Sequence, residues 1–263
     1  MTRPEKIYDS PRLAAGYAYG RPPVHQHIIQ SARDYLRLAG RLQRVLDVGC
    51  GAGLSTVALE PISQIVVGLE PVGTMLKHCR SIAPNALFLV GRAETLPFEA
   101  EVFDLITAAG SLNYADLDLF FRNTAQVLKP GGLLIIYDFS GGRHMPGDRR
   151  LYEWFAKFES RYPSRPNYNF DVRNLDYRRF GLRLEAYKEM QISVPMTLNE
   201  YLSYALSETR VELAITRGEP PSKIQAWCQH TLRDMFDDTP RDVLFNAYAA
   251  FVRRDSNESP GVR

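Results

Sequence analysis

Short apolar runs alternate with longer amphipathic stretches along the first half of the chain. Five runs are apolar and rich in branched residues, as expected of strands buried on both faces: 44–48, 65–69, 87–90, 104–108 and 133–138. Four stretches between or before them predict helices: 24–38, 54–59, 71–82 and 117–128. This alternation predicts an α/β fold, with a mostly parallel sheet covered by helices on both faces.

The second half of the chain continues with fewer strands and more helical sequence. Three stretches predict helices, at 150–162, 198–206 and 221–236, and two predict strands, at 182–194 and 243–252. The sequence therefore predicts a single domain over 41–254, with insertions at about 141–181 and 195–242 that could cap a pocket. The tail 255–263 is expected to be disordered.

The first strand runs into a turn with three glycines at alternate positions, Gly49, Gly51 and Gly53, in the sequence R-V-L-D-V-G-C-G-A-G. Glycines allow positive φ angles and leave backbone N–H groups open to a ligand. A dinucleotide fingerprint reads G-x-G-x-x-G, so the third glycine here comes one position early. Glu70 ends the second apolar run roughly 20 residues later, where an acid can accept both ribose hydroxyls. Together these features predict a nucleoside-binding cradle.

Further motifs follow in order: G-R-A-E-T-L-P-F at 91–98, F-D-L-I at 103–106, and L-K-P-G-G at 128–132 before an apolar run. With these motifs the first half of the sequence resembles the class I S-adenosylmethionine-dependent methyltransferases. The resemblance implies a Rossmann-like fold with a mostly parallel seven-stranded sheet, an antiparallel last strand and a helical cap insertion. One position departs from many relatives, because Arg92 stands where they carry an acid.

The resemblance also implies S-adenosyl-L-methionine as the cofactor, covered by the segment 1–40. Arg21 is expected to neutralise its methionine carboxylate, and Glu70 to bind its ribose. The residues expected to bind the cofactor are Tyr17, Arg21, Asp47, Gly49, Cys50, Gly51, Gly53, Glu70, Pro71, Ala93, Glu94 and Ala109.

The acceptor side of the site is indicated by fewer residues. Asn113 and Tyr114 follow the fourth strand at the expected pocket edge, and three residues of the cap are candidates for lining the acceptor pocket: Tyr201, Tyr204 and Glu208. His144 lies in a glycine-rich loop after the fifth strand, where it is the candidate general base. The alternatives are a solvated loop histidine and tyrosines packed in the core.

Composition narrows the range of partners. The net charge is +2 with both signs interspersed, and there is no basic stripe or N-P-P-Y-type tetrapeptide, which disfavours a nucleic-acid substrate. The three cysteines, Cys50, Cys79 and Cys228, form no C-x-x-C pair, so neither disulfides nor a metal site are expected. The N-terminal sequence lacks the apolar run of a signal peptide, and no membrane span is expected. A cytoplasmic protein is predicted.

The function predicted from the sequence is methyl transfer from S-adenosylmethionine to a small molecule, with oxygen favoured over nitrogen or carbon. A hydroxyl acceptor needs a base, whereas an amine with a free lone pair or a carboxylate does not. The alternatives are methylation of a protein, a non-catalytic S-adenosylmethionine-binding regulatory module, and a nicotinamide-dependent reductase.

Overall fold

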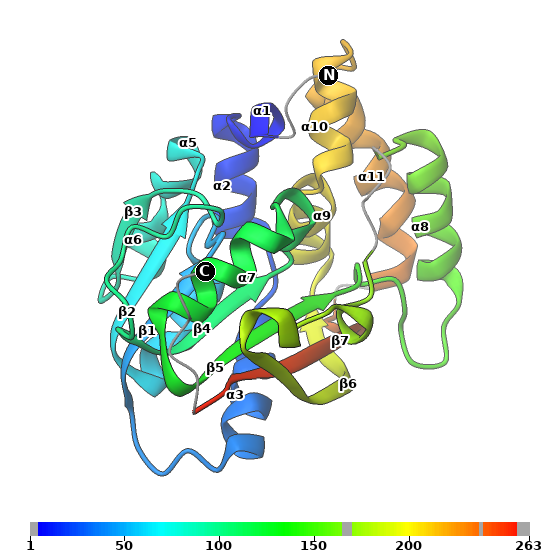
Figure 1. The fold of residues 1–263 in the computed structure, drawn as a ribbon. Coiled ribbons are helices and arrows are strands. Elements are labelled where there is room, and N and C mark those ends of the chain that lie inside the picture. Colours follow the sequence, from blue (N-terminus) through cyan, green and yellow to red (C-terminus); the bar gives the residue numbers. More distant parts are fainter. Residues whose placement is uncertain (1–4, 165–169, 237–238, 257–263) are drawn as a thin grey trace.

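The computed structural model describes residues 5–164, 170–236 and 239–256, and these contain a seven-stranded sheet with the order β3-β2-β1-β4-β5-β7-β6 (Figure 1). The strands are β1 Leu42–Val48, β2 Ser63–Glu70, β3 Leu87–Val90, β4 Phe103–Ala109, β5 Leu128–Phe139, β6 Leu182–Met196 and β7 Arg241–Arg254. Strands β1 to β5 pair in parallel, and β7 runs antiparallel to both β5 and β6. The predicted α/β fold with its antiparallel last strand is confirmed.

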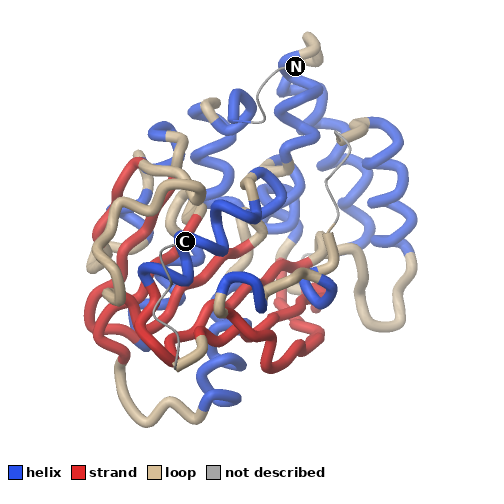
Figure 2. Tube along the Cα trace, viewed as in Figure 1, coloured by secondary structure: helices blue, strands red, loops and turns tan. Residues whose placement is uncertain are grey.

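Helices lie on both sides of this twisted sheet (Figure 2). They are α1 Glu5–Tyr8, α2 Pro11–Gly20, α3 Val24–Leu36, α4 Leu54–Leu59, α5 Gly73–Leu76, α6 Cys79–Ile82, α7 Leu117–Val127, α8 Arg150–Arg161, α9 Leu198–Leu206, α10 Thr209–Thr216 and α11 Pro221–Phe236. Short 3-10 turns are η1 Glu60–Ile62, η2 Leu112–Tyr114, η3 Val172–Asn174 and η4 Arg178–Phe180. No helix among the described residues is both long and apolar enough to cross a membrane.

Successive residues of the central strands feed two separate hydrophobic cores. Val45 and Leu105 pack with α3, α4, α8, α9 and α11 on one face, whereas Leu46 and Ile106 pack with α7 on the other. Side chains alternate between the faces of a strand, so a strand covered on both sides is apolar at every position. This explains why the central strands lack polar alternation.

Besides the unpredicted short helices α1 and α10, two helical regions next to the glycine turn and the cap differ from the sequence-based expectation. The stretch 71–82 was expected to form one helix, but it forms α5 and α6 with a break at Lys77 and His78. The break brings Cys79 against the glycine turn, where its thiol donates to the carbonyl oxygen of Gly51 at 3.3 Å. A tertiary contact thus overrides the local helical pattern.

Helix α2 is the second difference, because sequence patterning gave no helix over 11–20. Ser10 caps it by accepting the N–H of Leu13, and Gly16 and Gly20 form a face without side chains. A Cβ on Gly20 would lie 2.8 Å from the carbonyl oxygen of Ser203 in α9. Gly16 and Gly20 make the sequence of α2 less typical of a helix, but they also allow α2 to pack closely against α9 and the residue that follows it, Ser207.

The predicted insertions contain most of the remaining helices. Helix α8 and turns η3 and η4 lie between β5 and β6, and α9, α10 and α11 lie between β6 and β7. Asp255, the first residue of the predicted disordered tail, donates its backbone N–H to Gly181 at 3.0 Å. The tail from residue 257 lies outside the described residues.

Candidate functional site

The glycine turn between β1 and α4 is held by backbone hydrogen bonds to the end of β2. The N–H groups of Gly49 and Cys50 donate to the carbonyl oxygen of Leu69 at 2.8 and 3.1 Å. All three glycines of the turn have positive φ, and a Cβ on Gly49 would lie 2.3 Å from the Cβ of Ser111. The turn therefore requires glycine both for its backbone conformation and for its close approach to η2.

Asp47 supports the turn from inside the protein. Its buried carboxylate accepts hydrogen bonds from Ser55 Oγ at 2.6 Å, Thr56 Oγ1 at 2.7 Å and Thr107 Oγ1 at 2.9 Å. Burial raises the pKa of Asp47, and the three hydroxyl donors offset part of that rise. Asp47 thus ties β1 to α4 and β4, in a supporting position beneath the turn.

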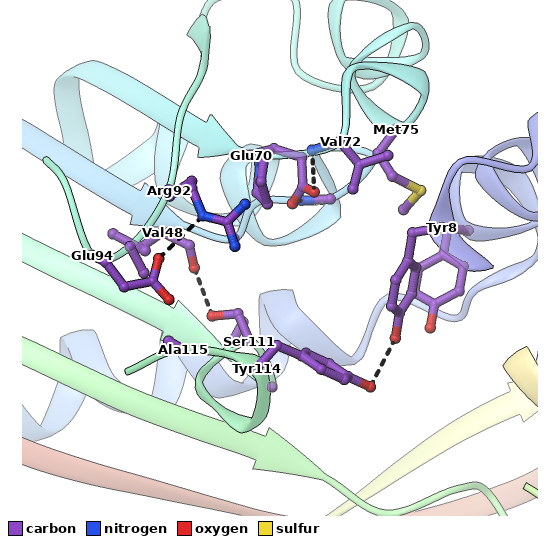
Figure 3. Close-up of a pocket in the computed structure, with 17 residues that line it drawn as sticks. Tyr8, Val48, Glu70, Val72, Met75, Arg92, Glu94, Ser111, Tyr114 and Ala115 are labelled. Carbon is purple, nitrogen blue, oxygen red and sulfur yellow. Dashed lines mark hydrogen bonds and ion pairs between the residues drawn. The ribbon is translucent and has the colours of Figure 1, made fainter. Parts of the chain in front are cut away.

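Glu70 ends β2 beside the turn (Figure 3). It accepts the backbone N–H of Gly51 through Oε2 and the N–H of Val72 through Oε1, both at 3.0 Å. The residue is only 7% exposed, so these two bonds fix the direction of its carboxylate. A carboxylate oriented this way beside a glycine turn can accept further hydrogen bonds from a ligand.

A cavity opens along this edge of the sheet, where the parallel strands end. Its lining residues are Tyr8, Tyr17, Val48, Gly49, Gly51, Glu70, Pro71, Val72, Met75, Arg92, Ala93, Glu94, Ala109, Gly110, Ser111, Tyr114 and Ala115. We call it the first cavity. At its mouth the hydroxyls of Tyr8 and Tyr114 share a hydrogen bond of 3.2 Å, which joins α1 to η2 (Figure 3).

An adjoining second cavity shares Tyr17, Gly49, Gly51, Ala109 and Gly110 with the first. Its other lining residues are Arg21, His25, Cys50, Ala52, Leu54, Ser55, Tyr137, Asp138 and Phe139. The glycine turn thus forms a wall common to two cavities of different polarity.

Arg21 enters the second cavity from the end of α2. Its guanidinium pairs with Glu208 at 3.1 Å, donates to the carbonyl oxygen of Ser207 at 3.2 Å, and lies 4.3 Å from the ring centre of Tyr17. Its Nε is buried and has no hydrogen-bond partner among the described residues. A buried donor without an acceptor costs about 1–3 kcal/mol, so this atom favours an anionic or polar ligand.

His25 and Tyr137 form a neutral pair in the same cavity. His25 Nδ1 lies 3.1 Å from the Tyr137 hydroxyl. Burial, followed by the charge of Arg21, lowers the pKa of His25 to about 4, and burial raises the pKa of Tyr137 well above its usual value. Both side chains are therefore uncharged near neutral pH.

The structure brings together most of the cofactor residues expected from the sequence. Those that line one or both cavities are Tyr17, Arg21, Gly49, Cys50, Gly51, Glu70, Pro71, Ala93, Glu94 and Ala109. Asp47 and Gly53 are not part of the described lining of either cavity; Asp47 supports the turn from inside, and Gly53 ends the turn where α4 begins. Arg92, the departure from the family pattern, lines the first cavity and pairs with Glu94 at 3.6 Å.

The expected acceptor residues are more scattered. Tyr114 lines the first cavity, whereas the described lining of the two cavities does not include Asn113. Tyr201 and Tyr204 are fully buried and hold Gly142, one donating to its carbonyl oxygen at 2.6 Å and the other accepting its N–H at 3.1 Å. Glu208 lies outside the cavities and contacts Arg21. The two cap tyrosines are therefore packed in the core, which was the alternative to lining the acceptor pocket.

His144 does not lie in either cavity. Its ring is exposed and stacks on Tyr152 with centroids 5.2 Å apart, and its carbonyl oxygen accepts the N–H of Leu244 at 2.8 Å. This pairing with β7 fixes the loop so that the imidazole is away from the glycine turn. The structure thus corrects the expectation that His144 is positioned as the general base.

Sequence reasoning missed several side chains of the site, among them Tyr8, His25, Tyr137 and Asp138. Asp138 had a usable signal, because it follows the apolar residues of β5 as Glu70 follows those of β2. Tyr8 and His25 come from helices before the first strand, and no local pattern shows that these helices face the site.

Residues 46–136 match the family model described as a methyltransferase domain. The chain is 36% identical over 119 residues to an uncharacterized methyltransferase of Synechocystis, which covers 44% of this chain and 54% of the relative. It is 37% identical over 102 residues to the mitochondrial ubiquinone biosynthesis O-methyltransferase of Rattus norvegicus, covering 35% of this chain and 30% of the relative. The chain spans about half the length, or less, of these relatives.

Among solved structures, one neighbour is a putative type II methyltransferase from Anaeromyxobacter dehalogenans. Its TM-score is 0.63 at 16% identity, with 88% of this chain and 96% of that chain covered. Together with the sheet order, this likeness establishes a Rossmann-like methyltransferase fold. The match of residues 46–136 to the methyltransferase domain family, together with the fold, confirms the resemblance seen in the motifs.

Proposed function

We propose that this protein is an S-adenosylmethionine-dependent methyltransferase that acts on a small molecule at an oxygen atom. The observation that carries the proposal is the oriented carboxylate of Glu70 beside the glycine turn, at the wall of a cavity. An acid in this place suits two ribose hydroxyls. The match of residues 46–136 to the methyltransferase domain supports the same ligand.

The two cavities fit the two ends of such a cofactor. The first offers apolar surface from Val72 and Met75 beside Glu70, which suits adenosine. The second offers Arg21, whose buried Nε has no partner among the described residues and suits a carboxylate. In this arrangement the shared wall at Gly49, Gly51, Ala109 and Gly110 holds the part of the cofactor between its ends. The proposal therefore uses both cavities.

When bound, the cofactor supplies a sulfonium-activated methyl group, so the protein has to align the acceptor and exclude water. Tyr8, Tyr17 and Tyr114 surround the first cavity, and burial raises the pKa values of Tyr8 and Tyr17. The hydroxyls of Tyr8 and Tyr17 therefore stay protonated near neutral pH. They can hold an acceptor by hydrogen bonds and cover it, while drawing no proton from it.

Oxygen is proposed as the methylated atom because two relatives are named as O-methyltransferases. The Rattus norvegicus relative is named an O-methyltransferase, and it is 37% identical to this chain over 102 residues. Its acceptor is not carried over, since the aligned residues make up only 30% of its length. The tyrosine hydroxyls of Tyr8 and Tyr17 can donate hydrogen bonds to a carboxylate acceptor, whose oxygen carries no proton and therefore needs no base.

The first experiment is calorimetric titration with S-adenosylmethionine, S-adenosylhomocysteine and NADH. We expect micromolar or tighter binding of the first two and none of the third. Affinity weaker than about millimolar, which corresponds to roughly 4 kcal/mol of binding, contradicts the proposal. Glu70→Ala should weaken binding by about 1.5–3 kcal/mol, because charged hydrogen bonds to the ribose are lost. Glu189→Ala, at an exposed position of β6, is the matched control and should leave affinity unchanged.

The second experiment measures formation of S-adenosylhomocysteine with a panel of phenols, alcohols, carboxylic acids and amines of low molecular weight. Mass spectrometry of the product then identifies the methylated atom. An O-methyl product supports the proposal, and an N- or C-methyl product contradicts its oxygen component. Binding of the cofactor without turnover on any member of the panel favours the alternative of a non-catalytic binding module.

A further inference from the structure

A separate cavity lies in the cap, where the C-terminal ends of α8 and α10 meet the start of α11 (Figure 1). Residues that line it include Arg161, Arg210, Arg217, Gly218, Glu219 and Lys223. We call it the cap cavity. Its described lining shares no residue with that of the first or the second cavity, so it is a distinct site.

Positive charge dominates the cap cavity. Four of its lining residues are basic, whereas Glu219 is the one carboxylate in the described lining. Glu219 pairs with Lys223 at 3.4 Å, so these two charges offset each other. Arg161 and Arg217 are exposed and form no ion pair with a described residue. The side chains around the cavity therefore leave an excess of positive charge unbalanced.

Arg210 is the buried cation of the cap cavity, with only 8% of its surface exposed. Its guanidinium donates to Glu159 at 2.8 Å, but Glu159 also pairs with Arg143 at 3.1 Å. Glu208 lies 3.9 Å from Arg210 Nε and has Arg21 as its nearer partner, at 3.1 Å. The Nε of Arg210 has no hydrogen-bond partner among the described residues. Three arginines thus share two carboxylates, and this network stays net positive.

Helix stability explains the positions of only two of these cations. A cation is favourable near the C-terminus of a helix and unfavourable near its N-terminus. Arg161 and Arg217 lie at the C-terminal ends of α8 and α10, where they suit the helix dipole. Arg210 and Lys223 lie in the first turns of α10 and α11 instead. A bound anion would offset the cost of these two placements.

The loop that joins α10 to α11 is ordered and leaves room for a ligand. The N–H groups of Arg217, Gly218 and Glu219 donate back to carbonyl oxygens in the last turn of α10 at 2.9–3.1 Å. Gly218 has a φ of 100°, and a Cβ placed on it would meet no atom within 4 Å. The backbone that carries Arg217 is therefore fixed beside open space. This arrangement lowers the entropic cost of binding a ligand there.

We propose that the cap cavity binds a dianionic phosphate group, with Arg210 on its buried wall and Arg161 and Arg217 at its exposed edge. Guanidinium groups form paired, charge-assisted hydrogen bonds with phosphate oxygens. Two arginines without an ion-pair partner balance a dianion better than a monoanion. Free phosphate and the phosphate monoester of a small molecule present this same group. The site goes beyond the proposed function and does not depend on it.

The test is calorimetric titration of the full chain at about pH 8 and about 50 mM NaCl, where phosphate is mainly dianionic and screening is modest. The ligands are inorganic phosphate, phenyl phosphate and, as a monoanion of similar shape, benzoate. The variants are Arg217→Gln and Arg161→Gln. Arg233→Gln is the matched control, because Arg233 is an exposed arginine of α11 outside the described lining. Thermal unfolding checks that each variant is folded.

We expect the wild type to bind one equivalent of phosphate with a Kd of roughly 0.1–1 mM, and benzoate at least about tenfold more weakly. Arg217→Gln and Arg161→Gln should each weaken phosphate binding by about tenfold, because each removes a charge-assisted hydrogen bond. Arg233→Gln should change the affinity by less than about twofold, since it removes only a distant, screened charge. Tighter binding of phenyl phosphate than of inorganic phosphate identifies a monoester as the ligand, and the reverse order identifies free phosphate.

Four results overturn the proposal. A folded wild type that binds neither phosphate has no such site, and benzoate bound as tightly as phenyl phosphate shows that a dianion is not selected. Phosphate binding that Arg217→Gln and Arg161→Gln leave unchanged lies elsewhere on the protein. A loss of affinity in Arg233→Gln equal to that in Arg217→Gln indicates an adventitious ion only. None of these results bears on the proposed function, which is tested by titration with the cofactor.

Discussion

Replacement of Asp47 tests whether the support beneath the glycine turn works as the structure indicates. The carboxylate accepts three buried hydrogen bonds, from Ser55, Thr56 and Thr107. Three bonds to a charged acceptor at roughly 1.5 kcal/mol each give about 4.5 kcal/mol. Burial raises the pKa of Asp47, which shows that the buried charge carries a desolvation cost, and Asp47→Ala removes this cost together with the hydrogen bonds. We therefore expect Asp47→Ala to lower the free energy of unfolding by about 3 kcal/mol in total.

The assay is thermal and urea unfolding without ligand. For a protein of this size, a loss of about 3 kcal/mol corresponds to a fall of roughly 6–12 °C in Tm. Thr107→Val removes one donor at nearly constant shape and should cost about 1 kcal/mol. Asp47→Asn keeps the shape and an acceptor, and the raised pKa indicates that a neutral side chain is tolerated, so it should lose less than half as much as Asp47→Ala.

The reasoning is refuted if Asp47→Ala is no less stable than Thr107→Val, because the three bonds would then contribute no more than one. It is also refuted if Asp47→Asn is as unstable as Asp47→Ala, since the charge would then be essential. The urea m-value should stay constant across the series, which shows that the variants differ in stability rather than in the extent of their folded structure.

Two further substitutions address the turn and the second cavity. Gly49→Ala places a Cβ 2.3 Å from the Ser111 Cβ at a φ of 73°, so we expect a loss of at least about 2 kcal/mol in stability and loss of S-adenosylhomocysteine binding by calorimetry. A stable Gly49→Ala protein that binds normally would contradict the geometry of the turn. His25 takes up a proton near pH 6.5 when unfolded but near 4 when folded, so its contribution to stability is complete above 6.5 and is lost as the pH falls toward 4. When the pH falls from 6.5 to 4, the free energy of unfolding of His25→Gln should therefore decrease by up to roughly 3 kcal/mol less than that of the wild type. Urea titrations of the wild type and of His25→Gln at pH 4 and pH 6.5 measure this difference. Equal losses of stability in the two proteins would show that His25 is not buried in its neutral form.

The strands and the glycine turn of the candidate site followed from local sequence. Helices α4, α9 and α11 begin and end where the apolar patterns predicted, because burial on one face leaves a direct signature in the order of residues. Strand β3 also has the predicted bounds, but it is the edge strand and is largely exposed, so the expectation that it is buried on both faces was wrong. The glycine turn and Glu70 were identifiable for a similar reason. A tight turn needs glycine at fixed positions, and the acid at the end of the next parallel strand necessarily lies beside it.

Contacts between distant segments were decided only by the tertiary structure. Nothing near His144 in the sequence shows that its loop pairs with β7 and turns the ring away, and nothing near His25 shows that α3 faces the second cavity. Tyr201 and Tyr204 had the spacing of either core or pocket residues, and only their hydrogen bonds to Gly142 distinguish the two. Arg21 and Asp138 are more than a hundred positions apart in the sequence, so their placement across one cavity depends on how α2 and β5 pack. Sequence by itself determined the elements and the turn, because these depend on neighbouring residues. The fold alone decided which charged side chains face the second cavity, because that depends on how the elements are packed together.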